Sequence, residues 1–134
     1  TRIDQAAAHL ERVDGVMVGR EAYQNPWSLI EVDHVLFGDT PTYPSRLDVL
    51  EAYKTYMRDE LEKGVPLKRL ARHLLGLFQG EPGARTWRRA LSEAAFRSGA
   101  DLTAIEAAQN SLDTTRREHA AVSAASNQGM GLRL

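Results

Sequence analysis

Residues 84–99 read ARTWRRALSEAAFRSG, and their pattern sets the fold class of the second half of the chain. Trp87, Leu91 and Ala95 recur every four residues, which is the spacing that puts side chains on one face of an α-helix. The glycine that ends the stretch is a common helix stop. We therefore expect a helix over residues 84–98 that buries this apolar face.

The sequence on either side of this stretch repeats the helical pattern. Further helices are predicted over residues 46–64, 66–80 and 101–119. Ser45 precedes the first of them and has Asp48 at the third helical position, a variant of the capping box. Four helices joined by short connections predict a four-helix bundle domain over residues 46–119. Residues 120–134 are rich in Ala, Ser, Asn, Gln and Gly, and they predict a flexible tail.

The first 37 residues show a different pattern. Residues 16–18 are a continuous apolar run, which fits a strand buried on both faces, as in parallel α/β sheets. Helical patterns flank this run over residues 4–12 and 22–37, and the second is broken at Pro26. Helix, strand and helix in this order are typical of the end of a TIM (β/α)8 barrel, although a whole barrel needs about 200 residues.

The sequence thus predicts a mostly α chain with two parts. Residues 1–37 form the C-terminal end of a barrel, and residues 38–45, which concentrate turn formers, form a linker to the helical bundle. The chain opens at Thr1 in what reads as the middle of a domain. We therefore expect it to be part of a longer protein.

Charge is distributed unevenly along the chain. The 17 Lys and Arg nearly balance the 18 Asp and Glu. Residues 67–99 nevertheless carry seven basic against two acidic side chains, a net charge of +5, whereas residues 1–64 carry seven against twelve, a net charge of −5. A local basic block of this kind indicates a phosphate-rich partner. A solvated helix face is the alternative interpretation.

Composition also excludes several classes of function. The chain has no cysteine, so disulfides, thiolate metal sites and a cysteine nucleophile or proton donor are excluded within it. The four histidines show no ligand spacing, and we expect no metal site. There is no apolar run long enough to span a membrane and no signal sequence at the N-terminus. We expect a cytoplasmic protein.

Gly19 and Arg20 directly follow the predicted strand. Loops after the last strands of a barrel commonly bind a phosphate through backbone N–H groups. Gly19 would let the backbone approach such a phosphate, and Arg20 would add a charge-assisted contact. A simple strand-to-helix turn is the alternative.

Two longer strings resemble a known family. Residues 14–26, DGVMVGREAYQNP, resemble the last barrel strand of the tRNA-dihydrouridine synthases, in which the Gly-Arg pair contacts the phosphate of FMN. Residues 73–89, HLLGLFQGEPGARTWRR, resemble the C-terminal helical domain of the A-type members of that family. The resemblance extends over residues 4–112, which is most of the chain.

The resemblance implies a two-domain enzyme, an FMN-binding barrel followed by a helical domain that binds tRNA. FMN, reduced by NADPH, delivers a hydride to the C5–C6 double bond of a uracil while a cysteine donates the proton. A-type members act on uridines 20 and 20a of the D-loop. Because the catalytic cysteine belongs to a part of the barrel that this chain lacks, we expect the chain alone to be inactive.

Arg85 and Arg88 are the second set of candidate site residues. On a helix they lie about 60° apart, beside the apolar stripe, and form a shared basic ridge. Cations in the first turn of a helix oppose its dipole, so packing gives no reason for arginines there, whereas a phosphate partner does. The resemblance implies that both contact tRNA. Weaker candidates for phosphate contacts, for which a solvated face is equally compatible, are Arg89, Lys68, Arg69 and Arg72.

Two other functions fit parts of the sequence. A stand-alone helical RNA-binding module would need only the basic helices and no flavin. A flavin barrel that reduces a small pyrimidine would share the Gly19-Arg20 turn but has no need of the basic helices.

Overall fold

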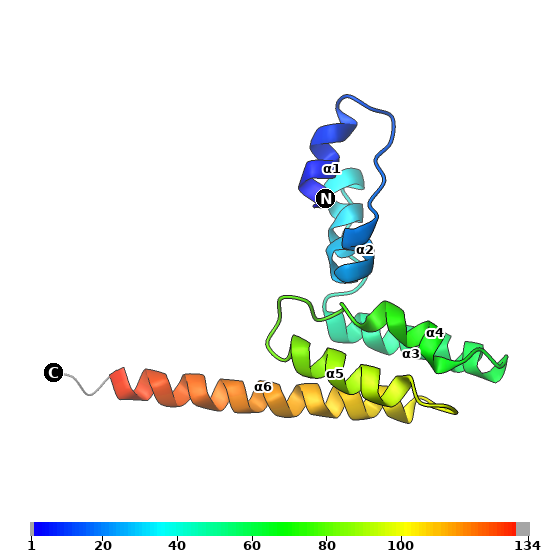
Figure 1. Cartoon of the computed structure of the whole chain (residues 1–134). Coiled ribbons are helices and arrows are strands. Elements are labelled where there is room, and N and C mark those ends of the chain that lie inside the picture. The colour runs from blue at the N-terminus through cyan, green and yellow to red at the C-terminus, as the bar shows by residue number, and fades with distance from the viewer. Residues whose placement is uncertain (1, 131–134) are drawn as a thin grey trace.

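A computed structural model describes residues 2–130, and within this range the chain is mostly helical and contains no strand (Figure 1). The elements in chain order are α1 (Ile3–Leu10), α2 (Arg20–Gln24), the 3-10 helix η1 (Pro26–Ile30), the π-helix η2 (Asp33–Phe37), α3 (Arg46–Glu62), α4 (Leu67–Ala71), the 3-10 helix η3 (Arg72–Leu74), α5 (Ala84–Ala95) and α6 (Thr103–Met130). None of these helices is long and apolar enough to cross a membrane.

The elements fall into two groups in space. Helices α3 to α6 pack against one another, with α5 lying along α6, while α1, α2, η1 and η2 form an arm that projects from this group (Figure 1). Within the arm α1 contacts η2 and α2 contacts η1. The predicted break at Pro26 is confirmed, since Pro26 begins η1 after α2 has ended.

Helices α3 to α6 enclose a single hydrophobic core, and the buried faces are those that the helical pattern predicts. Its largest fully buried side chains are Trp87, Phe78, Leu50, Met57, Leu67, Leu77, Leu91, Ile105 and Leu112. The Trp87 indole N–H donates to the Leu74 carbonyl at 2.8 Å. Its ring meets that of Phe78 edge-on, with the centroids 4.9 Å apart. The tryptophan therefore buries its apolar body without leaving its donor unpaired.

Helix α3 has the ends that its sequence predicts. The Ser45 hydroxyl accepts a hydrogen bond from the Asp48 N–H at 3.2 Å, which confirms the predicted N-cap. At the other end the Val65 N–H donates to the Glu60 carbonyl and the Gly64 N–H to the Leu61 carbonyl. This pair of bonds is the Schellman arrangement, and it requires the positive φ of +87° that Gly64 adopts.

The helix predicted over residues 66–80 is shorter in the structure. Helix α4 ends at Ala71, η3 continues to Leu74, and turns follow to residue 80. Side chains of other helices bond carbonyls of this segment: the Leu74 carbonyl accepts from Trp87 as well as from the Leu77 N–H, and the Leu77 carbonyl accepts from Arg46. The predicted length was wrong, and a helical pattern carries no information on these partners, because they come from other helices.

The predicted strand at residues 16–18 is also wrong. Residues 15–19 have no regular secondary structure, and Met17 is 83% exposed. A strand in a parallel sheet is held by hydrogen bonds to its neighbours, and residues 2–130 contain no strand that could pair with it. An apolar run gives a strand only where such neighbours are present.

Helix α6 is longer than the sequence predicts. It continues past residue 119 to Met130, although residues 120–129 are all exposed and pack against nothing. Their many alanines favour helix without needing a buried face. The rest of the predicted tail, residues 131–134, lies outside the described residues.

Candidate functional site

Gly19 and Arg20 lie at the point where the extended segment of the arm meets α2. Gly19 is the N-cap residue of this helix and Arg20 is its first residue. Both are exposed, and within residues 2–130 the Arg20 guanidinium makes no ion pair. A side chain at position 19 would come 3.2 Å from the sulfur of Met17. The exposed backbone and the unpaired cation fit an anionic group such as a phosphate.

Arg85 and Arg88 lie in the first turns of α5 and both are exposed. In the described part of the chain neither forms an ion pair with a carboxylate, and Arg88 Nη1 donates to Gln79 Oε1 at 2.9 Å. The neighbouring Arg89 differs, because its Nε lies 3.9 Å from the Glu93 carboxylate. Arg85 and Arg88 therefore form an arginine ridge that has no counter-charge among residues 2–130.

A groove of about 600 Å³ joins this ridge to the arm. Arg72, Gln79 and Arg88 line it from the helical group, and Glu21 and Tyr23 line it from α2. Sequence reasoning missed this groove because its two walls come from distant parts of the chain. It brings the end of the arginine ridge beside the helix that begins with Arg20.

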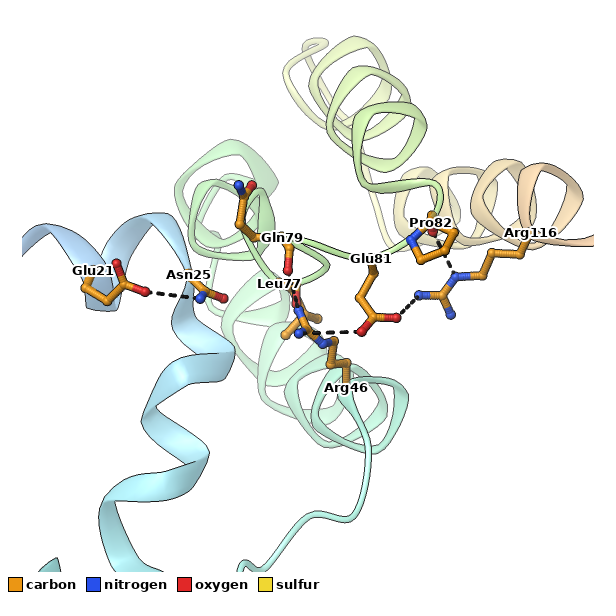
Figure 2. Close-up of polar contacts among 8 residues, drawn as sticks. All are labelled: Glu21, Asn25, Arg46, Leu77, Gln79, Glu81, Pro82 and Arg116. Carbon is orange, nitrogen blue, oxygen red and sulfur yellow. Dashed lines mark hydrogen bonds and ion pairs between the residues drawn. The ribbon is translucent and has the colours of Figure 1, made fainter. Parts of the chain in front are cut away.

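Two contacts hold the walls of the groove together. The Tyr23 ring meets His73 edge-on with the centroids 5.9 Å apart. Gly76 packs so closely against the backbone of Gln24 that no side chain could be accommodated there. The one carboxylate of the groove, Glu21, accepts a hydrogen bond from Asn25 Nδ2 at 3.1 Å (Figure 2).

Arg46 is a further residue that sequence reasoning did not select. Its guanidinium donates to the Leu77 carbonyl at 2.8 Å and to the Gln79 carbonyl at 3.0 Å. It also lies 3.7 Å from the carboxylate of Glu81 (Figure 2). Burial lowers the pKa of the Arg46 guanidinium by more than the neighbouring Glu81 raises it, but an arginine stays charged all the same. The signal that singled out Arg85, a cation in the first turn of a helix, applies equally to Arg46.

The weaker candidates for phosphate contacts lie in different places in the structure. Lys68, Arg69 and Arg72 are all exposed, but of these only Arg72 lines the groove beside Arg88. Lys68 borders a separate hollow of about 510 Å³ near the turns after α3 and α5. His, Asp and Glu side chains of the described residues form no group of three that could hold a metal ion.

The fold and the site define a mostly helical protein with an exposed arginine ridge beside a groove. The model of the family described as dihydrouridine synthase (Dus) matches residues 1–114, and the chain belongs to this family.

Three relatives illustrate the similarity, and all are named tRNA-dihydrouridine(20/20a) synthase. The protein of Shewanella oneidensis is 50% identical over 114 residues, which are 85% of this chain and 34% of the relative. That of Escherichia coli strain K12 is 51% identical over 104 residues, 78% of this chain and 30% of the relative. That of Vibrio cholerae is 47% identical over 106 residues, 79% and 32% respectively. The chain thus spans about a third of the length of these relatives.

Proposed function

We propose that this chain is the C-terminal part of a tRNA-dihydrouridine synthase that reduces uridines 20 and 20a of the tRNA D-loop. Membership of the family and identities near 50% to relatives that bear this name support the proposal. In this proposal residues 1–37 are the end of an FMN-binding TIM barrel, and residues 46–119 are a tRNA-binding four-helix bundle. Residues 38–45 link the two parts, and the protein works in the cytoplasm on its tRNA.

The observation that carries the tRNA-binding role is the exposed ridge of Arg85 and Arg88. Two neighbouring guanidiniums without a carboxylate partner repel each other, and they gain from an external anion. The phosphates of a tRNA backbone supply such anions at regular spacing, and guanidinium binds phosphate in a bidentate manner. Arg72, across the groove from Glu21, extends the same basic surface.

Gly19 and Arg20 are the proposed contacts to the phosphate of FMN. The exposed backbone of Gly19 and the unpaired Arg20 are compatible with this group. The flavin, with NADPH as reductant, supplies the hydride for the uracil double bond. The residues of this chain would anchor the cofactor at its phosphate and hold the tRNA. The resemblance implies a cysteine as proton donor, and because this chain has no cysteine, that donor would belong to another part of the protein.

The tRNA role is tested by removing single charges from the same helix. Arg88→Ala and the double variant Arg85→Ala, Arg88→Ala should weaken binding of an unmodified tRNA transcript. Each lost phosphate contact should reduce the slope of log K against log salt concentration by about 0.7 to 0.9. Arg89→Ala is the matched control, because it removes the same charge from an arginine that already faces Glu93.

Affinity and salt slope measured by fluorescence anisotropy distinguish the outcomes. If the double variant bound tRNA as tightly as the wild-type chain, the docking role would be wrong. If Arg89→Ala weakened binding as much as Arg88→Ala, the effect would be one of net charge and not of the ridge. In the intact synthase the double variant should keep its full FMN content, whereas Arg20→Ala should lower it.

A further inference from the structure

The turn between η3 and α5, residues 77–83, is held from one side by Arg46 of α3. The Arg46 guanidinium donates to two carbonyls of this turn, those of Leu77 and Gln79. Its side chain is only 17% exposed, and its charge faces the Glu81 carboxylate. A planar guanidinium with several donors can make these contacts together, which a lysine ammonium cannot do in the same geometry.

The same turn is held from the other side by Arg116 of α6. Its Nε donates to the Pro82 carbonyl at 3.2 Å, and its Nη2 lies 3.7 Å from the second oxygen of Glu81 (Figure 2). Glu81 thus lies between two arginines from different helices. Arg46 also lies over the Trp27 ring at 5.3 Å, so the contacts reach the arm.

This arrangement leads directly to the arginine ridge. Gln79 accepts from Arg46 with its backbone carbonyl and from Arg88 with its side-chain oxygen. Two hydrogen bonds therefore connect a half-buried arginine of α3 to an exposed arginine of α5. An exposed arginine has many rotamers, and fixing it on binding costs conformational entropy. A guanidinium already held by Gln79 loses less of this entropy.

We propose that Arg46, acting through Gln79, is a positioning residue that holds Arg88 ready for a backbone phosphate of the tRNA. The inference rests on the proposed function and adds to it a role for the hydrogen bond between Arg88 and Gln79. Neither Arg46 nor the backbone of Gln79 needs to touch the RNA. The two residues act on affinity by restricting the conformations of Arg88.

The test uses Gln79→Ala and Arg46→Met in the full chain. Gln79→Ala removes the acceptor of Arg88 without changing charge or the backbone carbonyl that Arg46 binds. Each variant should raise the Kd for an unmodified tRNA transcript about three- to tenfold. Lys54→Met is the matched control for Arg46→Met. It removes another half-buried cation of α3, one that bonds Glu51 and Gln109 and not the turn, and it should leave the Kd unchanged.

A double-mutant cycle separates positioning from a general loss of structure. In an Arg88→Ala background, Gln79→Ala and Arg46→Met should change the Kd by less than about twofold, because the group they position is gone. Equal fold-changes in both backgrounds, or no change in either, would overturn the inference. If Arg46→Met did not fold, as judged by circular dichroism, the Gln79→Ala cycle would decide alone. If the wild-type chain did not bind tRNA, the proposed function would fail first.

Discussion

Replacement of Gly76 by alanine tests how the arm is attached to the helical group. A methyl group at this position would lie 1.9 Å from the carbonyl oxygen of Gln24 and 3.2 Å from Cδ of Pro26. Both distances are shorter than a normal van der Waals contact, and the first neighbour is backbone, which cannot rotate away. The arm must therefore move off the turn for the methyl group to fit.

The sign of the change in the free energy of unfolding decides between two mechanisms. If only the entropy of the unfolded chain mattered, Gly76→Ala would stabilise the protein by about 0.4–1 kcal/mol. Overpacking at a tight contact costs about 1–3 kcal/mol. Because the contact here is closer than overpacked side chains usually come, we expect the clash to outweigh the entropy gain. The net change should be a loss of about 1–2 kcal/mol in the free energy of unfolding.

The fluorescence of Trp27 can report this change from the arm alone. Trp27 lies in the arm and Trp87 in the core, so in Trp87→Phe protein the fluorescence reports on Trp27 alone. Gly76→Ala should make Trp27 more accessible to a soluble quencher and should lower the urea midpoint. Gly15→Ala is the control, because a side chain at position 15 meets nothing within 4 Å. An unchanged or higher midpoint with unchanged quenching would refute the close contact.

Two further changes test the core and the start of α6. Trp87→Phe removes the indole donor from the Leu74 carbonyl, which keeps only the Leu77 N–H, so it should lower the free energy of unfolding by about 0.5–1.5 kcal/mol at an unchanged urea m-value; no loss would mean that the indole hydrogen bond does not stabilise the fold. The Asp101 carboxylate, just before α6, accepts a hydrogen bond from the Thr103 N–H, and its bonding to Thr103 lowers the pKa of the carboxyl from the ordinary 3.8. Its stabilising effect should be complete above that value and lost as the pH falls below it. The difference in melting temperature between wild type and Asp101→Ala should therefore shrink on acidification, and a difference that does not depend on pH would contradict the role of the charge.

Local pattern was sufficient to predict most of the helical half. The faces of α3, α5 and α6 that pack in the core are those with apolar residues every three or four positions, and the Ser45 cap depends on Asp48, three residues away. Such features depend only on residues within one or two helical turns of each other. For the same reason the position of Arg85 and Arg88 beside the Trp87 stripe could be read from helical geometry. The RNA and flavin roles of the site residues remain predictions.

Features that join distant segments could not be predicted in this way. Whether an apolar run becomes a strand depends on neighbouring strands, and residues 15–19 have none within the described chain. The segment after α4 likewise has carbonyls that bond side chains of distant helices, those of Trp87 and Arg46.

The arginine ridge therefore comes from the sequence, and its setting comes from the packing of the chain. Periodicity alone places Arg85 and Arg88 on one face of a helix. The groove beside Arg88, the link through Gln79 to Arg46, and the contact of Gly76 with the arm form only when segments far apart in the sequence meet. Hydrogen bonds and steric contacts act over a few ångströms in space, and a local sequence pattern carries no information on which distant residue will occupy that space.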